Sequence, residues 1–190
     1  MINTTFSPGW PTNILSGEIS NKELTDRVVE HLLINYDLEH PPGDINQQNL
    51  FKDSFFDEFK HEVIIPAFNI WLGQCLNSSV EELNPNYSMR AWITGVYNGY
   101  NIITHNHSGA HLSAVFYLLN DSPEAGGEII FFDPRGNANR GYKAAWTNYF
   151  APVTMQVPSY TFAVFPSFLY HQTTPFGGKM RLAMPVDLFL

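Results

Sequence analysis

The sequence has one cysteine and no long apolar run. Cys75 has no second cysteine with which to form an internal disulfide, so nothing points to an oxidising compartment. No stretch of about 18 apolar residues is present, and we therefore expect no membrane span. The N-terminus has no basic region followed by an apolar one, as a signal peptide would. These absences predict a location in the cytoplasm.

Basic residues are also scarce. The chain has 10 Lys and Arg against 18 Asp and Glu, which gives a formal net charge of −8. No run of basic residues occurs anywhere. Sequence-independent binding to nucleic acid requires a patch of basic residues that neutralises the phosphates, so we predict no nucleic-acid partner.

Aromatic and aliphatic residues, by contrast, are plentiful. Hydrophobic residues make up 44% of the 190 residues, aromatic residues 15% and charged residues only 15%. This composition is typical of a globular chain and not of a disordered one. The length fits a single domain, and the aromatic content suits a β-rich interior.

The first 90 residues carry helical patterns. Ser20–Glu23 has the form of a capping box, and apolar residues follow it at helical spacing. A second such pattern meets Pro66, which removes a backbone donor and should kink or restart the helix. We predict that the apolar members of both patterns are core residues: Leu24, Val28, Leu32, Leu33, Phe51, Phe55, Phe59 and Val63.

From about Arg90 the pattern changes to short β-type runs. We predict eight strands, at Ala91–Tyr97, Tyr100–Thr104, Leu112–Leu119, Glu128–Phe132, Val153–Val157, Tyr160–Phe165, Leu169–Thr174 and Met180–Leu190. Strands at this spacing favour a sandwich or closed barrel. The polar loop Asp133–Tyr149 is long enough to suggest a function, and we hypothesise a substrate lid. The expected domain therefore has a helical support region, residues 1–90, and a β core, residues 91–190.

Three histidines fall within seven residues, where the second predicted strand leads to the third. His105 and His107 are two residues apart, so on an extended chain their side chains point to one side and can converge on one ion. His171 lies on a later strand, and imidazole suits iron, zinc, copper and nickel. The sequence therefore predicts a metal site at His105, His107 and His171. The role of His111 stays open.

Two cations follow His171 on the last predicted strand, Lys179 and Arg181. Arginine is suited to bidentate capture of a carboxylate. A metal pocket that also contains Arg181 suggests a ligand that bears a carboxylate.

These motifs resemble those of prolyl-hydroxylase-type oxygenases that depend on Fe(II) and 2-oxoglutarate. The first half of the resemblance is the His105-Asn-His107 pair, the apolar strand Ser113–Leu118 and a Gly-Gly-Glu turn at residues 126–128. The second half is Asp133-Pro-Arg135, then Phe165-Pro-Ser followed by His171, and then Arg181. The pattern is most similar to small oxygenases of bacteria and their phages, which would place a phage-encoded chain in the host cytoplasm.

The resemblance implies a mainly β fold with N-terminal helices (α+β), built on a double-stranded β-helix, or jelly roll. It also implies Fe(II) as the metal and 2-oxoglutarate and O2 as co-substrates, with hydroxylation coupled to oxidative decarboxylation. Carried over by position, His105 and His171 would bind iron, Arg181 would pair with the distal carboxylate of 2-oxoglutarate, and Tyr117 would help to hold that carboxylate.

One position departs from the family pattern, because most members have aspartate where this chain has His107. The usual site for these oxygenases is two histidines and one carboxylate. Three arrangements stay open: His107 is the third ligand, Asp133 supplies a carboxylate, or His107 stands beside the site and water completes it. Arg135 could contact a substrate or be exposed.

Two other functions stay open at this point. A cupin-like metalloprotein could use the histidines without 2-oxoglutarate, and a β-helix module could bind or support other molecules without catalysis. The sequence does not identify the substrate, which could be peptidyl or a small molecule. A homodimer is also open, because the Phe-rich N-terminal half could cover the barrel or form an interface.

Overall fold

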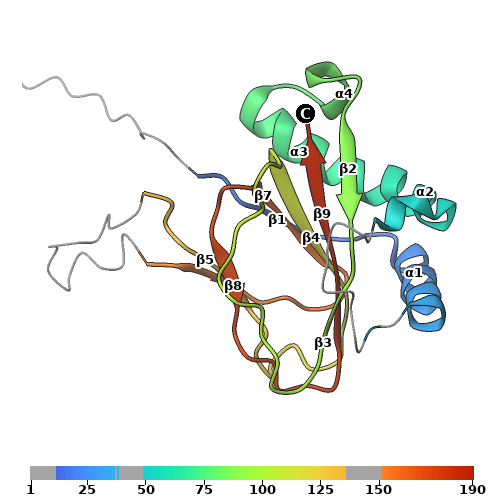
Figure 1. The fold of residues 1–190 in the computed structure, drawn as a ribbon, viewed down its shortest axis with the longest axis vertical. Helices are drawn as coiled ribbons and strands as arrows, with labels where there is room; N and C mark the ends of the chain where they lie inside the picture. The colour runs from blue at the N-terminus through green and yellow to red at the C-terminus, as the bar shows by residue number, and fades with distance from the viewer. Residues whose placement is uncertain (1–11, 37, 39–48, 136–150) are drawn as a thin grey trace, which may run out of the picture.

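The protein consists of three layers around two cores (Figure 1). The computed structural model describes residues 12–36, 38, 49–135 and 151–190. Helices from the N-terminal half cover one face of a six-stranded sheet, and a three-stranded sheet faces its other side. Every strand pairing among the described residues is antiparallel. None of the helices in these ranges is long and apolar enough to cross a bilayer.

The helical layer follows the predicted patterns closely. Its elements are α1 (Lys22–Asn35), the 3-10 turns η2 (Leu50–Lys52) and η3 (Ser54–Phe56), α2 (Asp57–Phe59), the π-helical turn η4 (Lys60–Ile64), α3 (Ile65–Leu76) and α4 (Val80–Leu83). Helix α1 is capped by Asn21, whose side chain accepts from the Leu24 amide, and not by Ser20. Pro66 lies in the first turn of α3, but the chain does not restart there, because α2, η4 and α3 follow one another without a break and the π-helical turn η4 comes just before the proline.

Two predicted core residues are wrong. Leu33 is 46% exposed, since it follows the buried Leu32 directly and lies about 100° further round the helix. Phe55 is 38% exposed, because it lies in a 3-10 turn and the four-residue spacing does not place it on the face of Phe59. The Phe55 ring instead stacks on His31, with 3.8 Å between ring centroids.

The strands occupy most of the predicted segments. They are β1 (Leu15–Glu18), β2 (Ser88–Ala91), β3 (Thr94–Val96), β4 (Leu112–Asn120), β5 (Ile129–Phe131), β6 (Val153–Met155), β7 (Thr161–Pro166), β8 (His171–Thr173) and β9 (Arg181–Phe189). The large sheet has the order β1-β7-β4-β9-β2, with β3 also paired to β9, and the small sheet has the order β6-β5-β8. These are two facing sheets and not a closed barrel.

Three differences from the predicted strands affect the site. The run Ala91–Tyr97 is split between β2 and β3, and β1 was not predicted. The run Tyr100–Thr104 forms no strand of its own, but it lies along β8, where the Thr173 amide donates to the Ile102 carbonyl at 3.0 Å. Most of the predicted lid, Asp133–Tyr149, lies outside the described residues.

Strands β4 and β9 are buried on both faces and separate the two cores. Along β4, Ala114 and Phe116 pack toward the helices, whereas Val115 and Tyr117 pack toward the small sheet. This is the two-residue alternation of a pleated strand. Strand β9 alternates in the same way, and its odd-numbered residues from Arg181 to Asp187 line the space between the sheets.

We expect Phe116→Ala to lower the free energy of unfolding by about 3–5 kcal/mol, because a buried ring would be replaced by a cavity. Phe116 is fully buried and contacts Phe59 of the helical layer edge to face. Urea unfolding followed by circular dichroism measures the change. Phe168→Ala is the matched control, since Phe168 is 58% exposed and its loss should cost less than about 0.5 kcal/mol. Equal losses in the two variants would contradict this account of the core.

Candidate metal centre

His105 and His171 lie directly opposite each other on neighbouring chain segments. The His105 amide donates to the His171 carbonyl at 2.9 Å, and the His171 amide donates to the His105 carbonyl at 2.9 Å. Side chains of such an antiparallel pair stand on the same face. Their ring centroids are 4.4 Å apart. Backbone pairing therefore brings together two histidines that are far apart in the sequence.

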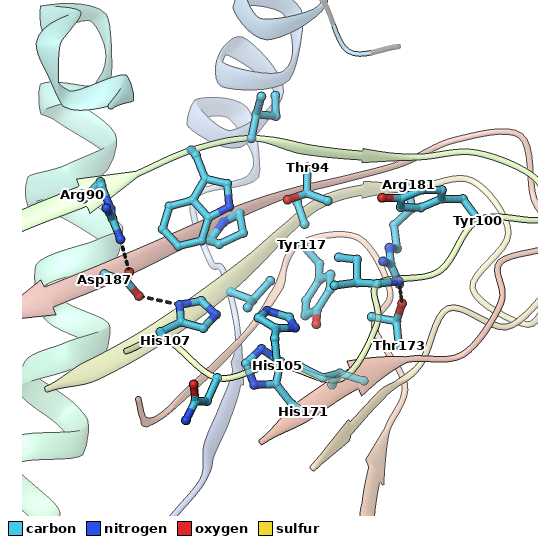
Figure 2. Close-up of a pocket in the computed structure, with 18 of the residues that line it drawn as sticks. Arg90, Thr94, Tyr100, His105, His107, Tyr117, His171, Thr173, Arg181 and Asp187 are labelled. Carbon is cyan, nitrogen blue, oxygen red and sulfur yellow. Dashed lines mark hydrogen bonds and ion pairs between the residues drawn. The ribbon is translucent and has the colours of Figure 1, made fainter. Parts of the chain in front are cut away.

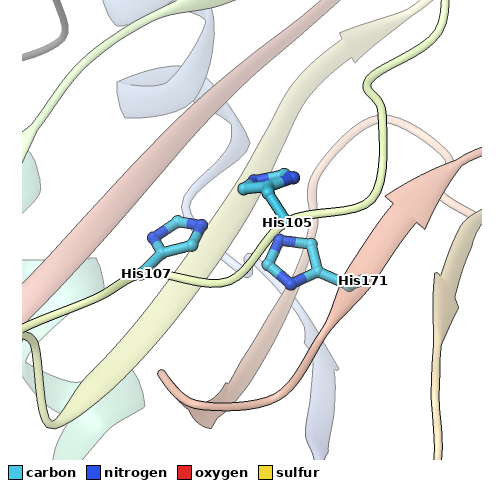
Figure 3. Close-up of side chains that lie close together, drawn as sticks. All are labelled: His105, His107 and His171. Carbon is cyan, nitrogen blue, oxygen red and sulfur yellow. The ribbon is translucent and has the colours of Figure 1, made fainter.

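His107 joins them from the same segment as His105. Its amide donates to the Ser167 carbonyl at 3.0 Å, which continues the pairing toward the end of β7. The His107 ring centroid is 5.3 Å from that of His105 and 5.2 Å from that of His171. One ligand nitrogen from each of the three rings lies within 4.8 Å of the others (Figure 3).

Hydrogen bonds fix the proton on the same nitrogen of all three rings. The Nδ1 atom of His105 lies 2.8 Å from the Ile103 carbonyl, and that of His171 lies 3.0 Å from the Leu169 carbonyl. The Nδ1 atom of His107 lies 2.6 Å from Asp187 Oδ1. A carbonyl or a carboxylate can only accept, so each Nδ1 must donate. In the neutral form of each ring Nε2 then carries the lone pair, and this is the form that binds a metal.

Burial keeps two of these rings neutral. It lowers the pKa of His171 to about 3, against a smaller opposing effect of the Leu169 carbonyl. Burial likewise lowers the pKa of His105 below its ordinary value. Because a charged imidazolium cannot bind a metal, these two rings are in the ligating form at neutral pH.

The other predicted site residues lie apart from this cluster. Asp133 does not belong to the cluster of three histidines. Its Oδ1 accepts a hydrogen bond from Arg135 Nε at 2.9 Å, and the side chain of Arg135 is the main cause that lowers the pKa of the Asp133 carboxyl. His111 is exposed, and its Nδ1 accepts from the Leu190 amide at 3.0 Å. Lys179 is exposed and lies two residues before β9.

Arg181 and Tyr117 line the same cavity as the three histidines. The cavity is about 470 Å³ and lies between the two sheets (Figure 2). Arg181 is 1% exposed, and its guanidinium lies 5.9 Å from the centroids of the Tyr117 and Phe176 rings. Burial lowers the pKa of this guanidinium, although arginine stays charged in proteins. Burial also raises the pKa of Tyr117, which keeps the hydroxyl protonated.

The Arg181 guanidinium is incompletely satisfied by protein groups. One terminal nitrogen donates to the Gly127 carbonyl, whereas Nε is buried with no hydrogen-bond partner among the described residues. Such an orphaned donor on a buried charge is costly unless another group accepts from it. A carboxylate-bearing ligand in the cavity would supply that acceptor, so the residues present fit 2-oxoglutarate as well as a metal bound by imidazole.

Sequence reasoning missed a buried acid in the same cavity, Asp187. Asp187 is 1% exposed and binds His107, Ser113 and Arg90. Burial alone would raise the pKa of its carboxyl, but these hydrogen bonds together hold it below the ordinary value. The sequence did contain a signal for it. Asp187 follows Arg181 by an even number of residues, six, so the two side chains lie on the same face of one strand, β9.

Solved structures with the same fold include two prolyl hydroxylases and an epimerase. A Pseudomonas putida prolyl-4-hydroxylase is 14% identical, with a TM-score of 0.59, over 93% of this chain and 85% of that one. A Trichoplax adhaerens prolyl hydroxylase in complex with a hypoxia inducible factor peptide is 13% identical, with a TM-score of 0.58, over 93% and 83%. The epimerase SnoN from nogalamycin biosynthesis, which is non-heme and α-ketoglutarate dependent, is 11% identical, with a TM-score of 0.61, over 94% and 78%.

These likenesses confirm the double-stranded β-helix fold. No curated protein matches the sequence. A family model described as "Putative 2OG-Fe(II) oxygenase", in which 2OG is 2-oxoglutarate, matches residues 90–187. The match covers the three histidines, Arg181 and Tyr117, and the family implies Fe(II), 2-oxoglutarate and O2 as its cofactor and co-substrates. The chain belongs to this family of 2OG-Fe(II) oxygenases.

Proposed function

We propose that this protein is a 2-oxoglutarate-dependent dioxygenase that hydroxylates a peptidyl substrate. The observation that carries the proposal is one cavity with a metal-ligand cluster and a buried, incompletely satisfied arginine. His105, His107 and His171 would hold Fe(II), and Arg181 with Tyr117 would hold the distal carboxylate of 2-oxoglutarate. Bound iron supplies the activation of O2, and one oxygen atom enters the substrate hydroxyl while the other enters succinate as CO2 leaves.

The protein's own contribution is to orient 2-oxoglutarate and to exclude water from the cavity. The Arg181 guanidinium is a rigid fork that can bind a carboxylate at two points, which would fix 2-oxoglutarate relative to the histidines. Val115, Ile129 and Ala183 line the same cavity with apolar surface. An apolar lining of this kind keeps bulk water away from the reacting atoms.

His107 would replace the carboxylate ligand of the usual facial triad. Asp133 is the alternative donor, but its carboxylate is bound by Arg135 and lies outside the histidine cluster. The nitrogen atoms of His107 are in place without any rearrangement of the chain, which favours a site of three histidines.

A peptidyl substrate is supported by the surroundings of the cavity. Four exposed apolar side chains come from the two segments that carry the iron ligands, namely Tyr100, Ile103, Phe168 and Tyr170. Exposed apolar groups on these segments, of which Tyr100 also lines the cavity, suit contact with a macromolecule. One protein with the same fold is a prolyl hydroxylase solved with a peptide.

We expect His171→Ala to weaken Fe(II) binding more than about 100-fold, since loss of a contact to a ligand alone costs about 10–100-fold. Anaerobic titration of the apoprotein with Fe(II) measures this. His111→Ala is the control, and it should bind Fe(II) like the wild type because His111 lies outside the cluster. Loss of binding in His111→Ala would favour the cupin-like site that uses all four histidines.

We expect Arg181→Met to weaken 2-oxoglutarate binding about 10–100-fold while Fe(II) binding persists, because charge-assisted hydrogen bonds contribute about 1.5–3 kcal/mol. The visible charge-transfer band of the Fe(II)–2-oxoglutarate complex reports the binding. Lys179→Met removes an exposed cation two residues away and should leave the band unchanged. If the wild type binds Fe(II) but forms no band, the protein does not use 2-oxoglutarate.

We expect peptides, and not free metabolites, to gain one oxygen atom when they are incubated with the Fe(II)-loaded protein and 2-oxoglutarate. Mass spectrometry of a peptide library, together with a succinate assay, measures the reaction, and His171→Ala provides the inactive control. Oxygen incorporation confined to small metabolites would refute the peptidyl assignment and leave the oxygenase assignment intact.

A further inference from the structure

Asp187 is a buried acidic residue whose carboxylate contacts one of the three candidate ligands, His107. His105 and His171 are each held through Nδ1 by a backbone carbonyl two residues earlier. His107 is held instead by the Asp187 carboxylate, and their 2.6 Å contact is the shortest of the three. The ring that stands where the family usually has an aspartate is therefore the ring that binds a carboxylate.

The register of the large sheet places Asp187 in a polar row. Asp187 of β9 lies directly opposite Ser113 of β4 on one side and directly opposite Arg90 of β2 on the other. Cross-strand neighbours in such pairs interact directly. Ser113 Oγ accordingly donates to Asp187 Oδ1 at 2.8 Å. Arg90 donates to Asp187 Oδ2 at 3.0 Å (Figure 2).

Each oxygen of Asp187 thus has a fixed partner before any ligand is bound. Arg90 balances the charge of the carboxylate and lies over the Trp92 ring, 5.6 Å from its centroid. Ser113 is in turn bound to Ser167 at 2.8 Å, and the Ser167 carbonyl accepts from the His107 amide. The backbone and the ring of His107 are therefore fixed through one connected network.

We propose that Asp187 is a positioning residue that makes His107 the third metal ligand. The Asp187 carboxylate accepts a hydrogen bond from the Nδ1–H group of His107. This bond directs the Nε2 lone pair of the same ring toward the cluster. The carboxylate also places a negative charge next to a site made of three imidazoles. A carboxylate hydrogen-bonded to a ligating histidine orients the ring and raises its basicity. In most of the family an aspartate ligand would supply the negative charge at the metal. In this protein the charge is on Asp187, which contacts the ligand His107 and not the metal.

This inference rests on the proposed metal site but not on the use of 2-oxoglutarate, so the test uses Co(II) alone. Three variants are compared with the wild type. Asp187→Asn keeps the shape and an acceptor oxygen but removes the charge, and Asp187→Leu removes both. Thr25→Val is the matched control, because Thr25 is also fully buried and its hydroxyl donates to the Asn21 carbonyl far from the cluster.

Two readouts are needed. Long-range proton–nitrogen NMR of the apoprotein reports which ring nitrogen of His107 is protonated, with assignment from His107→Ala. Chelator competition and the visible spectrum of the Co(II) protein report the affinity and geometry of the site. Thermal melting of each variant records the purely structural cost.

We expect the wild type to carry the His107 proton on Nδ1. Asp187→Asn should keep this tautomer and bind Co(II) about 10-fold more weakly, and Asp187→Leu should lose the tautomer and bind up to about 100-fold more weakly. Thr25→Val should melt earlier but bind Co(II) as the wild type does.

A His107 proton on Nε2 in the wild type would overturn the proposal. Equal Co(II) affinity and spectrum in the wild type and Asp187→Asn would also overturn it, even if Asp187→Leu does not fold. If the wild type binds no Co(II), the metal site itself is wrong, and this proposal fails with it. Metal binding that is insensitive to Asp187 refutes only the positioning role.

Discussion

The pairing of β4 with β9 supports both cores of the molecule. These two strands lie next to each other in the large sheet and are buried on both faces, so every side chain on them must enter one of two crowded spaces. Up to the irregularity after Tyr117 on β4, even-numbered residues pack with the helical layer and odd-numbered residues face the small sheet. The cavity exists because the odd-numbered face of β9 presents an arginine, an alanine, a proline and an aspartate where bulky apolar residues would fill it.

Burying charges in such a space is costly, and the structure offsets the cost differently at the two ends of β9. Asp187 is satisfied by protein groups alone, through a histidine, a serine and an arginine. Arg181 is satisfied only in part, since its Nε has no hydrogen-bond partner among the described residues. A fully paired charge fixes the geometry of its neighbours, whereas an incompletely paired one retains affinity for a ligand. At one end of β9, Asp187 therefore fixes the position of His107. At the other end, Arg181 is available to bind and release a ligand.

Much of the site could be predicted from the sequence because it depends on local spacing. The interval of two residues between His105 and His107, and the order of motifs up to Arg181, are visible without a fold. The position of Asp187 was not predicted, because its partners on β2 and β4 are set by strand register, which spacing within one segment does not encode. Helical spacing also misplaced Phe55, since it assumes a continuous helix where the chain forms a 3-10 turn. The spacing of the eight predicted strands left a sandwich and a closed barrel open, and the double-stranded β-helix followed from the resemblance of the motifs to those of 2-oxoglutarate oxygenases.

The backbone bridge between His105 and His171 has a consequence for how such a protein can change over evolutionary time. The two candidate ligands are aligned by main-chain hydrogen bonds, which any residue except proline could make at these positions. The side chains of Ile103 and Tyr170, next to them, are exposed and contribute little to that alignment. Such exposed side chains can therefore be exchanged without moving the candidate ligands, so the surface beside the site can diverge between relatives while the histidines stay in place.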